Sequence, residues 1–172
     1  MQAQMTQAKI VGPKDGRAGS LGGIGVRFMI DASESGGGFS LVEHPMPPRA
    51  LAAPLHKHSR EDEYTYVLEG SVGAQLGDEV VYGEPGDLIF KPRDQWHTFW
   101  NAGDTECRIL EIISPAGFEK FFDALVDMNE AGPPDPERLA ALAAEYGHYF
   151  DLEGTKKVIA EHGLVFPMLP EE

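Results

Sequence analysis

The chain has 172 residues, 42% of them hydrophobic, and this length suits one domain with a substantial core. Acidic residues outnumber basic ones 28 to 14, and the formal charge of −14 argues against a nucleic-acid partner, because that binding depends largely on Lys and Arg. No stretch approaches the roughly 20 apolar residues that span a bilayer, so we expect no membrane span and no membrane partner.

The first part of the chain predicts an arm followed by a β-rich domain. Residues 1–22 are polar and Gly-rich and are predicted to be a flexible N-terminal arm. Short segments rich in Val, Ile, Tyr and Phe then alternate with turns, which is typical of sandwiches and barrels. The predicted strands are 26–30, 39–44, 51–58, 64–69, 71–76, 79–82, 87–91, 96–101 and 108–113. We therefore predict an all-β barrel over residues 23–114.

The last third of the chain changes to a helical period. The apolar positions of its first helix are Phe118, Phe121, Phe122 and Leu125, at the spacing of one helical face. Gly and Pro residues at 132–134 end this helix, and Asp135, followed by proline, starts the next one. Gly147 is the expected end of the second helix, and a third is predicted over 155–161. Residues 115–172 are predicted to form a helical extension packed on the barrel, within one domain overall.

Three histidines and a glutamate are candidate metal ligands. His56 and His58 are two residues apart on a predicted strand, so their side chains share a face. Glu63 lies at an odd offset from His58, but the polar segment 59–62 can bend the chain and return it to the site. His97 comes from a later strand. Three imidazoles and one carboxylate suit one divalent transition metal, namely iron, manganese, nickel, cobalt, copper or zinc.

The framing of these residues resembles two motifs of the cupin superfamily. The matching patterns are His56-x-His58-x4-Glu63-x6-Gly70 and Gly86-x5-Pro92-x-Asp94-x2-His97-x3-Asn101. The resemblance covers roughly residues 50–113 and implies a double-stranded β-helix, or jelly-roll barrel, with the metal inside and often a homodimer. Two expected glycines are replaced by Ala50 and Asp94, and we expect the turn at Asp94 to survive because aspartate tolerates positive φ. Glu61 and Asp62 compete with Glu63 as the carboxylate ligand, and Asp62 is the better substitute because some members have a gap one residue shorter.

The chain is similar to single-domain bacterial cupins of the quercetin-2,3-dioxygenase-like type. This resemblance implies a metal-dependent dioxygenase acting on a small flavonol- or enediol-like substrate. Glu63 would then be both a ligand and the catalytic proton acceptor. Thr65, Val67 and Phe99 share strand parity with the ligands and are predicted to line either the substrate pocket or the barrel core.

Two other classes of function stay open. A metal-dependent isomerase, lyase or hydrolase would use the metal as a Lewis acid and would need a second base inside the barrel. Glu43 and Glu111 are candidates for that base by strand position. A non-catalytic, metabolite-binding protein is the other class.

The remaining signals favour ordinary roles. His44, His148 and His162 lack ligand spacing and are assigned to structural or exposed positions. The single cysteine, Cys107, excludes an internal disulfide and is expected to be a buried strand residue. The N-terminus lacks the apolar core of a signal peptide, so we expect a cytoplasmic protein.

Overall fold

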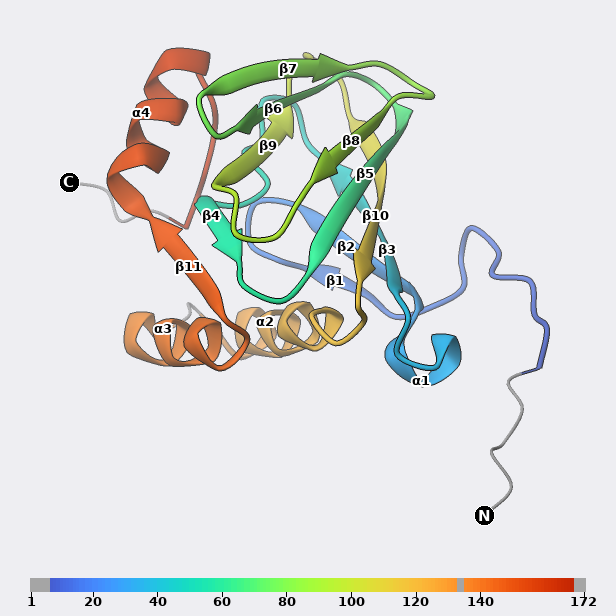
Figure 1. Ribbon diagram of the computed structural model, residues 1–172. Coiled ribbons are helices and arrows are strands. Elements are labelled where there is room, and N and C mark those ends of the chain that lie inside the picture. Colours follow the sequence, from blue (N-terminus) through green and yellow to red (C-terminus); the bar gives the residue numbers. More distant parts are fainter. Residues whose placement is uncertain (1–6, 133–134, 169–172) are drawn as a thin grey trace.

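The computed structural model describes residues 7–132 and 135–168, in which two antiparallel sheets pack face to face (Figure 1). The six-stranded sheet has the order β1 (Ala18–Ser20), β2 (Gly25–Ile30), β3 (Ser40–Met46), β10 (Cys107–Ser114), β5 (Asp62–Glu69), β8 (Leu88–Lys91). The five-stranded sheet has the order β11 (His148–Asp151), β4 (Leu55–His58), β9 (His97–Asn101), β6 (Val72–Leu76), β7 (Glu79–Gly83). The first six residues of the predicted arm, and Pro133 and Pro134, lie outside the described residues.

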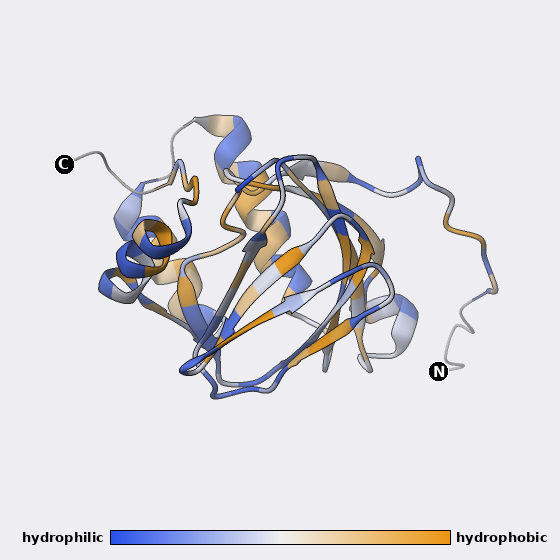
Figure 2. Ribbon diagram, turned by 90° about the horizontal axis from the view of Figure 1, so that it is seen from above, coloured by the Kyte–Doolittle hydropathy of each residue, from blue (hydrophilic) through white to orange (hydrophobic). Residues whose placement is uncertain are grey.

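Each predicted strand overlaps an observed one. Burial alternates at every position along β3 and β10, because successive side chains point to opposite faces of the sheet. The largest boundary difference is in the predicted strand 51–58, of which only Leu55–His58 forms β4. Figure 2 shows the corresponding alternation of hydrophobic and hydrophilic segments along the strands. Asp94 has a φ of 64°, so the turn predicted there is present.

The jelly-roll fold is confirmed, but the expected closed barrel is not. Within residues 7–132 and 135–168, no strand ladder joins one sheet to the other. The edge strands β7 and β8 are linked only through the turn at residues 84–87, where Glu84 and Asp87 bond to each other's backbone or side chain. The core therefore lies between two sheets that are open at their edges.

The helices are α1 (Ala32–Ser35), α2 (Glu119–Ala131), α3 (Pro136–Glu145) and α4 (Leu152–His162). The predicted limits of α2 and α3 are confirmed: Gly132 follows α2, and the Asp135 side chain accepts a hydrogen bond from the Glu137 N–H at 2.9 Å. α4 begins earlier than predicted because Asp151 caps it through the Gly154 N–H. In Figure 1, α2 and α3 lie below the sheets and α4 lies beside them.

Two strands were not predicted, and one of them shapes the site. β1 falls inside the segment expected to be a flexible arm, where it pairs with β2. β11 directly follows Gly147, whose φ of 65° turns the chain out of α3. It adds to the edge of the five-stranded sheet with His148 opposite His58 and Phe150 opposite His56.

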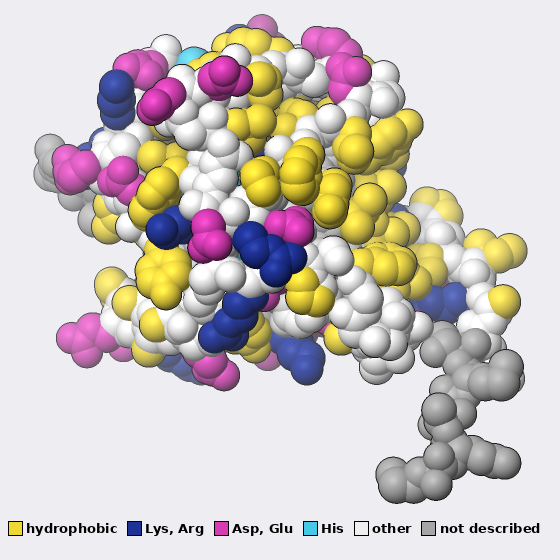
Figure 3. All heavy atoms as spheres, viewed as in Figure 1, with side chains coloured by type: hydrophobic (Ala, Val, Ile, Leu, Met, Phe, Trp, Pro, Cys, Tyr) yellow, Lys and Arg dark blue, Asp and Glu magenta, His cyan; other side chains and the backbone are white. Residues whose placement is uncertain are grey.

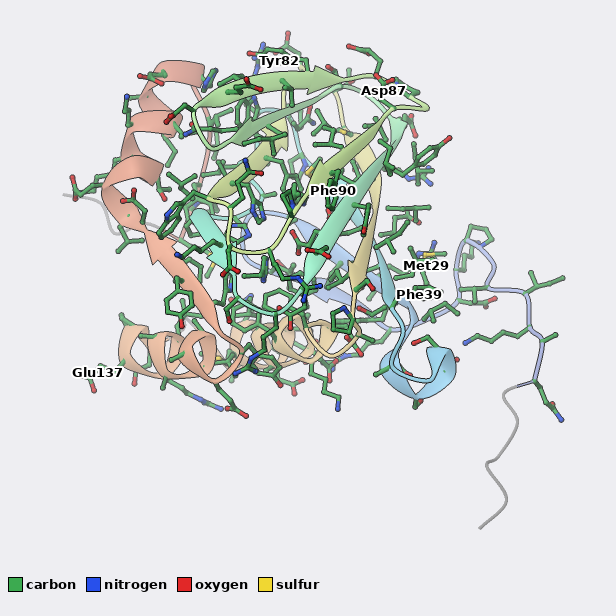
Figure 4. The ribbon with its side chains drawn as sticks, viewed as in Figure 1. Met29, Phe39, Tyr82, Asp87, Phe90 and Glu137 are labelled. Carbon is green, nitrogen blue, oxygen red and sulfur yellow. The ribbon has the colours of Figure 1, made fainter. Side chains whose placement is uncertain are left out.

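The outer face of the six-stranded sheet carries exposed hydrophobic side chains. Tyr66 on β5 and Leu88 and Phe90 on β8 are 38%, 55% and 48% exposed. Figure 3 shows hydrophobic side chains gathered on this side of the molecule, and Figure 4 labels Phe90 on β8. Phe90 also stacks on Tyr64, with ring centroids 4.9 Å apart. In the part of the chain that the structure describes, no helix has the length and apolar character needed to cross a bilayer.

Candidate metal centre

The structure brings the four predicted ligands to one point between the sheets. His56 and His58 lie on β4, His97 lies on β9, and Glu63 lies on β5. One possible ligand atom from each of the four lies within 4.8 Å of all the others. The odd offset of Glu63 is explained by the chain leaving one sheet after β4 and entering the facing sheet at β5. Glu63 therefore reaches the histidines from the opposite side.

Local backbone carbonyls fix the orientation of two of the rings. The Nδ1 atom of His56 lies 2.6 Å from the Pro54 carbonyl oxygen, and Nδ1 of His97 lies 3.0 Å from that of Gln95. A carbonyl only accepts, so both Nδ1 atoms carry the proton, and each Nε2 presents a lone pair. Metal-binding histidines are commonly oriented by such a bond to the other ring nitrogen.

The Nε2 atoms and carboxylate oxygens that converge here are all acceptors or negatively charged. They therefore need a cation between them. Nε2 of His97 lies 3.2 Å from one carboxylate oxygen of Glu63, and Nε2 of His58 lies 3.3 Å from the other. Among the described residues, neither ring nitrogen of His58 has a hydrogen-bond partner. All four residues are at most 3% exposed, so these acceptors are shielded from bulk solvent. The donor set therefore fits a divalent transition metal.

Neither of the competing carboxylates belongs to the cluster. Asp62 accepts hydrogen bonds from the Arg93 side chain at 2.9 and 3.0 Å and points away from the histidines. Glu61 lies 3.8 Å from Nδ1 of His58, the nitrogen opposite the one that faces Glu63. Glu61 therefore lies on the other side of the His58 ring, and Glu63 is the carboxylate that joins the cluster.

A second group of charged side chains is buried next to the cluster, and only Glu111 among them was a candidate from its strand position. The fully buried Lys91 ammonium lies 3.1 Å from Glu63 and 2.8 Å from Glu111. Thr65 donates a hydrogen bond to Glu111 at 2.8 Å. Of the two predicted candidates for a second interior base, Glu111 lies in this group, whereas Glu43 pairs with Arg27 and Arg108.

The pKa shifts of the buried side chains favour the protonation states that bind a metal. Burial lowers the pKa of His56, and the neighbouring histidines lower it further, so the ring is neutral. Burial would raise the pKa of Glu63, but Lys91 and His58 outweigh it and hold that pKa well below its usual range. Burial raises the pKa of Glu111 to about 7 despite the nearby Lys91. A neutral imidazole and an ionised carboxylate are the forms that bind a metal.

The three residues predicted to line a pocket or the core are all buried. Val67 belongs to the hydrophobic core between the sheets. Thr65 bonds Glu111, and the Phe99 ring lies 4.2 Å from the Lys91 nitrogen. Two of the three therefore contact the interior charged groups, and their role towards a substrate stays a prediction.

Aromatic side chains of the C-terminal extension cover the cluster, and the sequence did not reveal this contact. The rings of Phe118 and Phe121 are called the aromatic roof below. The Phe118 ring lies 4.3 Å from that of His58 and packs on Phe121. His148, from β11, lies 4.7 Å from both His56 and His58 between ring centroids. The helical spacing of the phenylalanines predicted a buried face, but the partner of that face is set by tertiary packing. The other histidines without ligand spacing lie elsewhere: His44 bonds Gly25, and His162 stacks on Trp100.

Comparison with known proteins shows to which family this chain belongs. A family model described as a cupin domain matches residues 43–113. The polyketide cyclase RemF from Streptomyces resistomycificus is 30% identical in sequence, with a TM-score of 0.55 over 63% of this chain and 80% of RemF. This chain belongs to the cupin superfamily.

Two further proteins are similar to this chain. The tetracenomycin polyketide synthase protein TcmJ from Streptomyces glaucescens is 28% identical over 93 residues, which are 54% of this cupin and 62% of TcmJ. This cupin thus spans less than two thirds of the length of TcmJ. An RmlC-like cupin from Shewanella frigidimarina has a TM-score of 0.55 at 18% identity, covering 67% of this chain and 99% of that one, and shares the fold alone.

Proposed function

We propose that this cupin is a metal-dependent enzyme that moves protons on a small, enolisable carbonyl compound of the polyketide class, leading to cyclisation or isomerisation without a redox step. The observation that carries the proposal is the second interior carboxyl group, Glu111, connected to Glu63 through Lys91. A non-redox carbonyl reaction needs such a base in addition to the metal ligands.

The chain supplies distinct groups for this chemistry. A divalent metal held by the three histidines and Glu63 would provide Lewis-acid polarisation of a carbonyl oxygen. Glu63 would accept a proton from the substrate carbon, and the Lys91 ammonium helps to hold the pKa of its carboxyl low so that it stays ionised. Glu111, on the far side of Lys91, offers a second proton site in the same interior. The rings of Phe118, which contacts His58, and Phe121 would shield the site from water.

The relatives support this class of substrate. RemF is described as a polyketide cyclase, and TcmJ is described as a polyketide synthase protein. Polyketide chains carry alternating carbonyl groups whose intervening C–H bonds are acidic, so proton removal next to a polarised carbonyl is the reaction that the site would catalyse.

Proton exchange is the direct test. Zinc-loaded protein is incubated with 2,4-pentanedione and longer poly-β-ketones in D2O without oxygen, and exchange and ring formation are followed by NMR. We expect exchange above the buffer rate, a loss of at least about 100-fold in Glu63→Gln, and near-complete loss of bound metal in His97→Ala. His162→Ala, remote from the cluster, is the matched control for both measurements. No exchange by the zinc, cobalt, nickel, manganese or iron forms would contradict the proposal.

A dioxygenase acting on flavonols or other enediols is the second candidate. The observation that favours it is the set of three histidines and one glutamate, whose donors also suit redox-active metals. Oxygen consumption by the iron, manganese, nickel or cobalt forms with quercetin would support it. An active zinc form under anaerobic conditions, with no oxygen uptake by the other forms, would exclude it in favour of the first proposal.

A further inference from the structure

His148 is a fourth imidazole at the candidate metal centre, contributed by the C-terminal extension. Because it lies directly opposite His58 in the β11–β4 ladder, its side chain points to the same face of the sheet. Its ring is nearly parallel to that of His58, at 10°, and nearly perpendicular to that of His56, at 81°. The ring thus covers the two β4 ligands from the side of the roof.

The ring nitrogens of His148 have no protein partner to explain them. The residue is 6% exposed, and within the described part of the chain neither Nδ1 nor Nε2 makes a hydrogen bond. Leaving a buried polar group unpaired costs about 1–3 kcal/mol, so two unpaired nitrogens at one buried position call for a partner outside the protein. Its protein neighbours on the roof side are the apolar rings of Phe118, Phe121 and Phe150.

Hydrogen bonds of the residues before and after His148 fix its position. The Ser59 N–H donates to the Gly147 carbonyl at 3.0 Å, and Arg60 donates to the Glu145 carbonyl at 3.1 Å. After the strand, Asp151 caps α4. The turn that follows α3 is therefore attached to the turn that follows β4, and the ring is held over the metal-binding residues.

We propose that His148 is a ligand-binding residue, which hydrogen-bonds through its imidazole to an oxygen of the small molecule held beside the four metal-binding side chains. It is not one of the four residues whose ligand atoms lie within 4.8 Å of one another, so its role is towards the small molecule and not the metal. A neutral imidazole N–H in a buried site binds an enolate-like or hydroxamate-like oxygen well. This inference rests on the proposed metal centre and extends it to recognition of the substrate.

The test separates metal binding from small-molecule binding. Co2+ affinity is measured on the full chain by competition with a chelator, and acetohydroxamic acid is then titrated into the Co2+ form while the visible spectrum is recorded. His148→Phe retains a ring but has no nitrogen, whereas His148→Asn and His148→Gln place an amide nitrogen near the Nδ1 or the Nε2 position. Phe150→Leu is the matched control, because it alters a ring in contact with His148 without removing a hydrogen-bonding group.

We expect His148→Phe to bind Co2+ within about threefold of the wild type and to bind acetohydroxamic acid at least about tenfold more weakly, the effect of one charge-assisted hydrogen bond. At least one of the Asn and Gln variants should recover most of that loss. Unchanged hydroxamate affinity in all three variants would overturn the inference, as would a matching loss of Co2+ affinity, which would make His148 a metal ligand. If His148→Phe does not fold, the two amide variants decide, since only the correctly placed amide should keep affinity. Absence of Co2+ binding by the wild type would instead refute the metal centre.

Discussion

The Lys91 ammonium shows how single residues are stabilised inside this protein. It is fully buried, and burial alone would lower its pKa. Glu111 and Glu63 together outweigh that effect and raise the pKa, so the side chain stays charged. The stabilisation is mutual, because the two carboxylates would otherwise be buried charges without a counter-ion.

Removing this cation should strongly destabilise the metal-free protein. We expect Lys91→Met to lower the free energy of unfolding by about 3–5 kcal/mol, since it leaves Glu63 and Glu111 buried without the cation that both of them contact. Adding Glu111→Gln should recover part of the loss, because a neutral amide needs neither a counter-ion nor a bound proton. Urea denaturation of the two variants measures both values. A double variant no more stable than Lys91→Met alone would show that Lys91 and Glu111 are not energetically coupled.

His44 predicts a specific dependence of stability on pH. It is buried against Phe122 and bonded to the Gly25 carbonyl, and burial lowers its pKa from 6.5 to about 4. The unfolded chain therefore binds a proton that the folded chain does not bind between these values. The stability contributed by neutral His44 is complete above about pH 6.5 and falls, by up to about 3 kcal/mol, as the pH drops to 4.

A comparison of pH profiles isolates this histidine from the other titrating groups. The free energy of unfolding of the wild type should fall more steeply between pH 6.5 and 4 than that of His44→Gln, by close to one proton in the slope. Urea titrations at several pH values provide the two profiles. Parallel profiles would mean that folding does not lower the pKa of His44.

At the scale of elements, the sequence predicted strands and helices by periodicity but missed β11. The strand has only four residues, and its pairing with β4 involves residues about 90 positions away in the sequence. The sequence predicts Gly147 as the end of a helix but does not show that it also lies against a second turn. A Cβ added there would lie 2.3 Å from the Ser59 hydroxyl, so the close approach of two turns also requires glycine.

Gly147→Ala should therefore loosen β11 specifically. Gly163 is a matched control, since it ends α4 at a similar φ of 62° but has open space around its Cβ position. We expect Gly163→Ala to cost about 1 kcal/mol for backbone strain and Gly147→Ala to cost about 2–3 kcal/mol. Hydrogen exchange at the amides of Tyr149 and Phe150 should accelerate only in the Gly147 variant. Equal effects of the two substitutions would show that the contact with Ser59 carries no energy.

At the scale of the whole molecule, the family resemblance predicts that two copies of the chain associate. We expect a homodimer in solution, with a mass about twice the 18.8 kDa of the chain by light scattering after size exclusion. The net charge of −14 opposes non-specific association, so a dimer that persists at low salt would reflect a specific interface. A single species of monomer mass over a wide concentration range would contradict this expectation.

The sequence by itself determined the strands from β2 to β10, the limits of α2 and α3 and the identity of the four clustered side chains, because these follow from local periodicity, capping and motif spacing. Only the tertiary structure decided that Glu63 arrives from the facing sheet, that Lys91 lies between two carboxylates, and that the sheets do not close. It also decided that His148 and Phe118 cover the centre. Contacts of this kind join residues from separate strands and helices, and no local pattern encodes which of those elements become neighbours.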